Sequence, residues 1–346
     1  NYSLNNSETD SDTEIIFSVY IANQGAMADV EIISTMTNED SAIGGIIGIN
    51  EYDQESAQLV GRLSNAFVMG SIKGIYNIGG AIGINKTPAL SSVVTVSSGQ
   101  ISAIGQAQTQ PIYYVENVKS NVQIVGDTSV GGIVGSDNGG SYKDVHYQIL
   151  SSTNSGISAS SKVGGIAGSS QYGIFLYCSV MSYRWDYNSL QAITGEADIK
   201  GNQYVAGIVG YATGDGISLN ENENTVKTVI VQSSSVNAYI LADTGSVATS
   251  NIGGILSNGN ADTDSILYNA YFMGRIDGNF SYLSSPDQTQ HFALSNNTNI
   301  IYNNVYSVVF DIDLGELVIG NYSNGNGGML IGGTSDMSGW VDSDVW

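Results

Sequence analysis

Ile43-Gly44-Gly45-Ile46-Ile47-Gly48 decides the fold of this chain, because the same six-residue phrase returns along the sequence. Each copy has an aliphatic residue, two glycines, two small apolar residues and a further glycine, with looser matches in the last two copies. The copies occupy residues 43–48, 78–83, 130–135, 163–168, 205–210 and 252–257. Recurrence of one unit every 30 to 50 residues or so is typical of a solenoid, in which each repeat stacks on its neighbours.

The segments between the phrases favour strands over helices. Residues 66–72, 92–96, 145–149 and 228–232 are rich in β-branched and aromatic side chains, and Gly, Asn, Asp and Ser surround them. Such runs are typical of short strands joined by turns. We therefore predict an all-β chain that folds as a right-handed parallel β-helix of roughly ten coils. Each phrase is expected to form one strand of a single stacked sheet, with a column of Ile46, Ile133, Ile166 and Ile208 between rows of glycine.

The composition argues against several partners. The chain has 346 residues, 32 acidic and only 10 basic side chains, and a net charge of −22. A nucleic-acid-binding protein needs clustered Lys and Arg to neutralise phosphates, so nucleic acid is excluded as a partner. The longest uncharged stretch, residues 87–115, is interrupted by Ser, Gln, Gly and Pro, so no membrane insertion is expected within this chain.

The phrase and the segment that follows it resemble the GLUG repeat of bacterial and protist surface proteins, including IgA-protease-like and filamentous-adhesin-like β-helices. The second half of that motif is matched by residues 65–74 and 269–278, and in part by residues 177–181. Residues 304–346 resemble the closing coil that follows GLUG arrays. The resemblance implies a parallel β-helix with an extracellular, structural or adhesive role, and it implies no ligand. The peptidase portion of the IgA-protease-like relatives has no counterpart in this sequence.

This organisation predicts residues 1–14 as a polar lead-in and residues 15–346 as a single β-helix array. The spacing between phrases is irregular, so the surplus forms either additional coils or loops that project from one side. Residues 183–201 and 283–299 are expected to be such excursions. Because neither end offers a helical cap, we also expect the native chain to continue beyond Trp346, or a neighbouring subunit to cover that end.

No residues stand out as catalytic. His146 and His291 are the only histidines, and a Ser/His/Asp triad would have to be drawn from many serines, without the Gly-x-Ser-x-Gly elbow. The single cysteine, Cys178, lies in an apolar strand and is interpreted as core packing. A groove in which acidic side chains meet Arg184 or Lys200 would favour catalysis, whereas grooves of Ser, Asn and Tyr would favour adhesion.

One segment has the ligand spacing of a calcium site. Asn258, Asn260, Asp262 and Asp264 place side-chain oxygens at alternate positions, which suits Ca²⁺ in a turn. The segment lacks the glycine and the distal glutamate of an EF-hand loop. The alternative is a solvated turn whose side chains bond their own backbone. Calcium is the only cofactor that the sequence suggests.

We therefore expect an extracellular or cell-surface β-solenoid without enzymatic activity. It would serve as a structural or adhesive spacer in a surface or filament assembly, with other protein subunits as partners and carbohydrate as a further candidate. The alternative is a β-helix that binds or cleaves polysaccharide. Cleavage would require two carboxylates on neighbouring coils about 5 to 9.5 Å apart, or Ca²⁺ with a basic residue.

Overall fold

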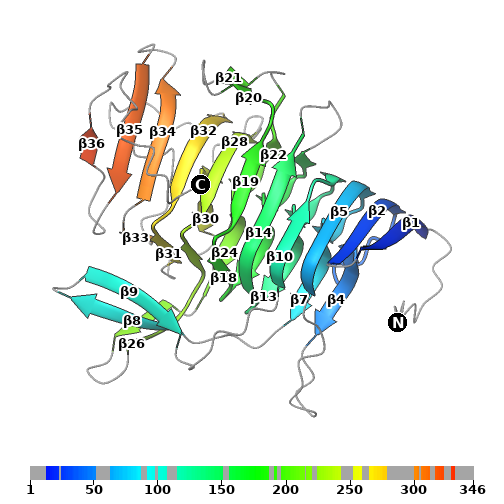
Figure 1. Ribbon diagram of the computed structural model, residues 1–346, viewed down its shortest axis with the longest axis horizontal. Coiled ribbons are helices and arrows are strands. Elements are labelled where there is room, and N and C mark those ends of the chain that lie inside the picture. The colour runs from blue at the N-terminus through cyan, green and yellow to red at the C-terminus, as the bar shows by residue number, and fades with distance from the viewer. Residues whose placement is uncertain are drawn as a thin grey trace.

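The chain is built from stacked β-strands. The computed structural model describes residues 13–22, 25–51, 63–86, 92–97, 100–106, 115–150, 156–186, 191–192, 196–214, 216–219, 224–242, 252–258, 265–278, 300–303, 305–311, 316–322 and 329–331. These residues contain no helix, and most of them lie in three sheets that run side by side along the long axis of the molecule (Figure 1). The prediction of an all-β chain with stacked parallel strands is confirmed.

The largest sheet, sheet A, runs from the N-terminal to the C-terminal end of the stack (Figure 1). Its strands are β1 (Thr13–Ala22), β2 (Gly25–Ser34), β5 (Leu63–Lys73), β10 (Val115–Ser120), β11 (Gln123–Val125), β14 (Ser141–Ile149), β15 (Ile157–Ser158), β18 (Ile174–Leu176), β19 (Ser179–Ser182), β22 (Ile199–Gly201), β27 (Ile230–Gln232), β28 (Ser235–Ala242), β31 (Ser265–Tyr268), β32 (Tyr271–Gly278), β33 (Ile300–Asn303), β34 (Val305–Asp311), β35 (Glu316–Tyr322) and β36 (Met329–Ile331). Pairing is parallel from β2 to β34. At the two ends, β1 pairs with β2 and β35 pairs with β34 and β36 in antiparallel fashion.

Two narrower sheets complete each coil. Sheet B contains β3 (Ile43–Gly44), β6 (Tyr76–Gly79), β12 (Thr128–Gly131), β16 (Ser161–Gly164), β23 (Gln203–Ala206) and β29 (Ile252–Gly253). Sheet C contains β4 (Ile47–Glu51), β7 (Ile82–Lys86), β13 (Val134–Asn138), β17 (Ala167–Gln171), β24 (Val209–Thr213) and β30 (Leu256–Asn258). The chain passes from sheet A to sheet B to sheet C and back to sheet A, so consecutive repeats lie on top of one another.

The phrases stack in register, as the repeat predicts. In sheet B, Val130 pairs with Ile78 on one side and with Val163 on the other. In sheet C, Val134 likewise pairs with Ile82 and Ala167. Equivalent residues of successive phrases are therefore neighbours across a parallel ladder, about 4.8 Å apart.

The expectation that each phrase is one strand of one sheet is wrong. The first two residues belong to sheet B, the last two belong to sheet C, and the middle two form a bend between the sheets, as at Gly45 and Ile46. The physical reason is the space at the bend. A Cβ atom on Gly165 would lie 2.2 Å from the carbonyl oxygen of Gly207 in the next phrase and 2.5 Å from Cγ2 of Val180 in sheet A. Only a residue without a side chain lets the three sheets approach so closely.

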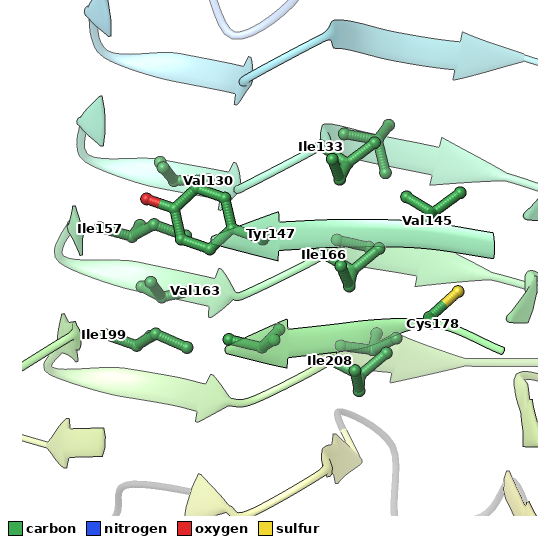
Figure 2. Close-up of a cluster of buried hydrophobic side chains, with 14 of the residues drawn as sticks. Val130, Ile133, Val145, Tyr147, Ile157, Val163, Ile166, Cys178, Ile199 and Ile208 are labelled. Atoms are coloured by element: carbon green, nitrogen blue, oxygen red, sulfur yellow. The ribbon is translucent and has the colours of Figure 1, made fainter. Parts of the chain in front are cut away.

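The aliphatic residue at the bend points into the core. Ile133, Ile166 and Ile208 form a column in which each side chain is fully buried, and Ile46 packs against the same core at its N-terminal end. Figure 2 shows this column beside that of Val130 and Val163 from sheet B. The backbone continues the column, since the Ile133 N–H donates to the Ile166 carbonyl at 3.0 Å and the Ile166 N–H to the Ile208 carbonyl at 3.1 Å. The expected isoleucine column is thus confirmed.

Some of the additional residues between the phrases form strands that lie outside the coils. The strands β8 (Ser92–Ser97), β9 (Gln100–Gln106), β25 (Gly216–Leu219) and β26 (Asn224–Lys227) make an antiparallel lateral sheet beside the stack (Figure 1). Among the described residues, sheets B and C have six strands each. They define six levels of the stack, one level being one turn of the chain through the sheets, and this is fewer than the roughly ten coils expected. The excursion expected at residues 183–201 is a short hairpin of β20 (Trp185–Asp186) and β21 (Gln191–Ala192), after which β22 rejoins sheet A. Residues 283–299 lie outside the described residues.

Candidate functional site

Sheet A carries on its outer face a row of residues with left-handed backbone conformation, at which each strand kinks without a change of register; we call it the bulge row. One residue in each of six consecutive levels adopts a left-handed conformation, with φ between 48° and 54°. The row consists of Asn65, Asn117, Asp144, Tyr177, Ser233 and Asn269. These residues are equivalent in register, because the strand residues on both sides of them pair from level to level. Asn and Asp tolerate this conformation better than other residues with a side chain, and they fill four of the six places.

Each left-handed residue turns two consecutive side chains toward solvent. In β14, both Lys143 and Asp144 lie on the outer face, and Val145 then returns to the core with no exposed surface. At the N-terminal part of this row the outer face holds a cleft of about 750 Å³. It is lined by Ser64, Asn65, Glu116, Asn117, Lys119, Asp144 and His146, contributed by β5, β10 and β14. We call it the sheet A cleft.

Polar contacts link the levels of the sheet A cleft. The Asn117 side-chain amide donates to Oδ1 of Asn65 at 2.7 Å, so the two bulge residues form an amide ladder. Nζ of Lys143 lies 3.3 Å from Oε1 of Glu116. Both pairs join one level of the stack to the next.

His146 lies in the cleft with its ring partly buried. Its Nδ1 atom lies 2.7 Å from Oγ of Ser179 on the adjacent strand. Burial lowers the pKa of His146 below its ordinary value of 6.5, the positive charge of Lys119 lowers it further, and Asp144 opposes the shift. His146 is therefore neutral at pH 7.

The His146–Ser179 pair places a base beside a hydroxyl, as a nucleophilic site requires. Acyl transfer also needs donors that point at a developing oxyanion. Ser179 sits on β19, between the paired strands β14 and β28, so its backbone is engaged in the parallel ladder. The pair supplies a hydrogen bond between adjacent levels of the stack.

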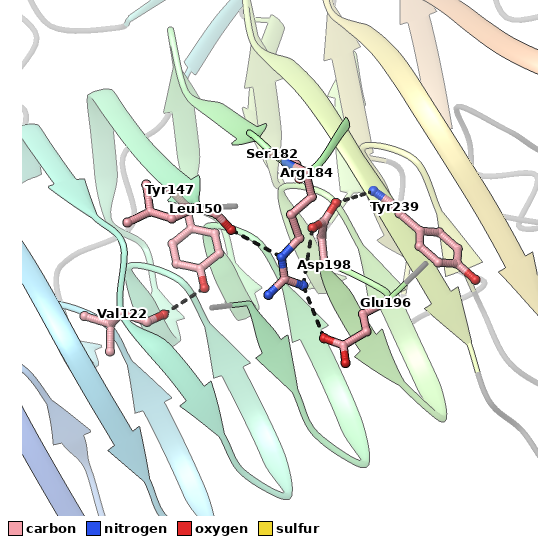
Figure 3. A network of polar contacts seen from close by, with 8 residues as sticks. All are labelled: Val122, Tyr147, Leu150, Ser182, Arg184, Glu196, Asp198 and Tyr239. Carbon is pink, nitrogen blue, oxygen red and sulfur yellow. Dashed lines mark hydrogen bonds and ion pairs between the residues drawn. The ribbon is translucent and has the colours of Figure 1, made fainter. Parts of the chain in front are cut away.

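A second polar cluster surrounds Arg184, where the chain leaves sheet A for the β20–β21 hairpin (Figure 3). Its Nη1 atom lies 3.9 Å from both Oε2 of Glu196 and Oδ1 of Asp198, and its Nε donates to the Leu150 carbonyl at 3.2 Å. Arg184 and Asp198 are each 1% exposed. Two acids therefore meet Arg184: Asp198 lies inside the fold, and Glu196 lies at the surface with its side chain 62% exposed.

Burial alters the ionisation of Asp198. Loss of solvent raises the pKa of Asp198 to about 6, although the Tyr239 backbone N–H, Ser182 and Arg184 favour the charged form. Its Oδ2 accepts from the Tyr239 N–H at 2.8 Å, whereas Oδ1 is without a hydrogen bond from any described residue. A buried ion pair of this kind costs desolvation energy that the partner only partly offsets.

A third polar cluster runs through the interior where sheet C turns toward sheet A. The Asn50 amide donates to Oδ1 of Asn85 at 2.7 Å, and the Asn85 amide donates to Oδ1 of Asp137 at 3.0 Å. Asp137 also accepts from the Tyr142 hydroxyl at 2.6 Å and from the Ser170 hydroxyl at 2.7 Å. Burial raises the pKa of Asp137, and these hydrogen bonds lower it in part. The cluster joins four levels and is enclosed, so it stabilises the stack and is closed to a ligand.

The remaining candidates from the sequence fall as follows. Asn258 ends β30, and Asn260, Asp262 and Asp264 lie outside the described residues, so the calcium prediction stays a prediction. Within the described residues, no group of three or more His, Cys, Asp or Glu side chains is arranged to hold a metal ion. Cys178 is buried, and burial strongly raises its thiol pKa, so its interpretation as core packing is confirmed. His291 lies outside the described residues.

Comparison with known proteins adds no relative, since no family model, curated protein or solved structure matches the chain. The GLUG resemblance therefore rests on the motif residues alone. In the part of the chain that the structure describes, no helix is long and apolar enough to cross a membrane.

Sequence reasoning missed the bulge row. The sequence contained a weak signal for it. Asn65 and Asn269 are the first residues of the two segments, 65–74 and 269–278, that match the second half of the GLUG motif. Asn117 and Asp144 occupy the equivalent position, and each is followed by a valine. An Asn or Asp directly before a buried small or β-branched residue, repeated at each level, is the pattern that would have predicted it.

Proposed function

We propose that this chain is an extracellular structural or adhesive β-solenoid, folded as a right-handed parallel β-helix of GLUG-type repeats. The observation that supports this most is the in-register stacking of the glycine phrases through sheets B and C. A stack in which each repeat contacts only its neighbours extends in one direction and presents long, regular faces. Such a shape suits a spacer or a building block of a surface assembly.

The location of the two buried acids, Asp137 and Asp198, supports the same proposal. Asp137 and Asp198, whose pKa values burial raises, are enclosed in hydrogen-bonded clusters that join levels of the stack. Catalytic groups with shifted pKa values normally lie where a substrate reaches them. In this chain these two acids serve the fold, and the outer face carries mostly Ser, Asn and Tyr side chains along the bulge row.

Localisation tests the extracellular part of the proposal. Intact cells that express the chain from its own gene are treated with a protease that cannot cross the membrane, and the chain is followed by immunoblot. Loss of the chain from intact cells is expected, together with retention of a cytosolic marker. Protection of the chain until the cells are lysed would show that it is not a surface protein.

Activity tests the structural part against the polysaccharide-cleaving alternative. The purified chain is incubated with pectin, cellulose and β-glucans, and new reducing ends and unsaturated uronates are measured. We expect neither product above the buffer control, with and without added Ca²⁺. Sustained product formation that scales with protein concentration would establish the enzyme instead.

A further inference from the structure

The sheet A cleft is an open polar feature on the outer face of the described part of the stack. We propose that it binds a neutral, hydroxyl-rich glycan chain that lies along the stacking direction, over the bulge row. This inference deepens the adhesive role proposed above and names its ligand class. It rests on three features of the cleft: its charge, its hydrogen-bonding groups and its aromatic neighbour.

The charge of the cleft is balanced, although the chain as a whole carries −22. Glu116 and Asp144 contribute two negative charges to the lining and Lys119 contributes one positive charge, while Lys143, outside the lining, forms an ion pair with Glu116. Two of the ten basic residues of the chain are thus gathered at one site, and His146 is neutral at pH 7. The rest of the surface would repel a polyanion, and the cleft itself offers no surplus of either charge to select a charged ligand. A neutral ligand fits this balance.

The hydrogen-bonding groups suit hydroxyls. A sugar hydroxyl both donates and accepts, and carboxylates and side-chain amides are the groups that can bond two adjacent hydroxyls at once. Asn65, Asn117, Asp144 and Glu116 supply such groups on three consecutive levels. Because the levels repeat at the strand spacing, the same kind of contact recurs along the stack, as a chain of similar sugar units requires.

An exposed aromatic ring continues the row. Tyr177 occupies the bulge position one level beyond Asp144, and it is 50% exposed. An aromatic ring combines an apolar face, on which the C–H face of a sugar packs, with a polar tip. The ring, the amides and the acids stand on a sheet whose backbone is fixed by the ladder, so little conformational entropy is lost on binding.

The test is a binding titration with defined oligosaccharides. Cellohexaose, laminarihexaose and mannohexaose serve as neutral probes, and hexagalacturonate and deacetylated chitohexaose serve as charged ones. We expect at least one neutral hexasaccharide to bind with a Kd at or below about 1 mM, and raising the salt concentration to leave that Kd unchanged. Neither charged probe is expected to bind more tightly than the neutral one.

Matched variants locate the ligand. Tyr177→Ala removes the ring over the row, and Asn117→Gly removes the amide while keeping a residue that accepts its φ of 53°. Each is expected to weaken binding about tenfold, with the thermal midpoint little changed. The control is Tyr183→Ala, since Tyr183 is 48% exposed but lies outside the bulge row; it should leave the Kd unchanged.

Three outcomes would overturn the proposal. They are no binding of any neutral hexasaccharide, binding of the charged probes alone, and an equal loss of affinity in Tyr183→Ala. A chain that proves to be on the cell surface yet binds none of the neutral probes would refute this inference and leave the proposed structural role intact. A chain that is protected inside the cell would refute the proposed function itself.

Discussion

Replacement of Gly165 by alanine tests the steric account of the phrase. Gly165 forms the bend between β16 and β17, where the three sheets come together. An added Cβ would lie 2.2 Å from the Gly207 carbonyl oxygen, 2.5 Å from Cγ2 of Val180 and 3.1 Å from Cδ1 of Ile199. The first of these atoms belongs to the backbone of the next phrase, so it cannot move away by rotating a side chain.

The expected cost follows from how far the neighbours must move. An ordinary contact begins at 3.4 Å, so the 2.2 Å to the Gly207 oxygen falls short by at least 1.2 Å. The next phrase is held in place by the hydrogen bond from the Ile166 N–H to the Ile208 carbonyl at 3.1 Å. Overpacking a tight core typically costs about 1–3 kcal/mol, and a backbone obstacle puts Gly165→Ala at about 3 kcal/mol or above. The gain of about 0.4–1 kcal/mol from a stiffer unfolded chain does not offset this. Gly165→Val should cost more.

The same motif supplies the control. Gly48 is the last residue of the first phrase, it is exposed, and a Cβ there would approach no described atom closer than the Ala42 carbonyl oxygen at 3.4 Å. Its counterpart Gly83 would bring a Cβ to 2.5 Å from the Ile43 nitrogen. In urea or guanidinium unfolding followed by circular dichroism, Gly48→Ala should stay within about 0.5 kcal/mol of the unaltered chain, while Gly83→Ala and Gly165→Ala are clearly destabilised. Equal effects at Gly48 and Gly165, or none at Gly165, would refute the reasoning.

Three further predictions concern buried groups. The pKa of Asp198 rises from 3.8 in the unfolded chain to about 6 in the folded protein. Protonated Asp198 therefore stabilises the fold by about 3 kcal/mol below pH 3.8, and this contribution is lost as the pH rises through 6. In unfolding titrations, Asp198→Asn should flatten the increase in stability that the unaltered chain shows between pH 7 and pH 5. Tyr142→Phe keeps the ring stacked on Phe175, with centroids 4.7 Å apart, but removes the 2.6 Å hydrogen bond to Asp137, and it should lower the unfolding free energy by about 1.5–3 kcal/mol. The Cys178 thiol, 1% exposed, should react with a thiol reagent at pH 8 only as the chain unfolds.

Each of these has a contrary outcome. An unchanged pH profile in Asp198→Asn would mean that the buried carboxyl does not titrate in this range. A neutral Tyr142→Phe would mean that water or another group satisfies Asp137 without the hydroxyl. Stoichiometric labelling of Cys178 within minutes under native conditions would place the thiol at the surface.

The phrase predicted the stacking but not the bend. Register follows from recurrence, because equivalent residues of identical repeats must meet their counterparts, as Ile78 and Val130 do. If the side chains of the phrase alternate between two faces, as they do in a strand, the phrase is predicted to be one strand with two apolar faces. What this prediction overlooks is that adjacent glycines, as at Gly164 and Gly165, remove the Cβ atoms that would keep the sheets apart. The change of direction is a steric effect between levels, which no single copy of the phrase displays.

The sequence predicted a strand at residues 92–96 but gave no signal for the pairing that forms the lateral sheet. Ser92 and Val93 of β8 pair with Val226 and Thr225 of β26, more than a hundred residues later. Each hairpin is a plausible short strand pair by composition, but their pairing depends on the three coils that bring the two excursions to one side of the stack. The Arg184 cluster has the same origin, because β22 brings Asp198 back to sheet A after the hairpin. Long-range contacts of this kind follow from the topology and not from local patterns.

Contacts between levels also explain why the sheet A residue that faces the second glycine of the phrase differs from repeat to repeat. In five of the six phrases the second glycine faces an inward side chain of sheet A, and Tyr147 meets Gly132 where Ser120 meets Gly80. Tyr147 and Ser120 are paired across adjacent strands, and the Tyr147 hydroxyl reaches back one level to donate to the Val122 carbonyl at 2.8 Å (Figure 3). The small serine leaves the room that the tyrosine ring occupies, as close packing of a narrow core demands. Repeats that carry different residues at this place are therefore matched to their neighbours, and exchanging two of them would break the packing although every phrase remained intact.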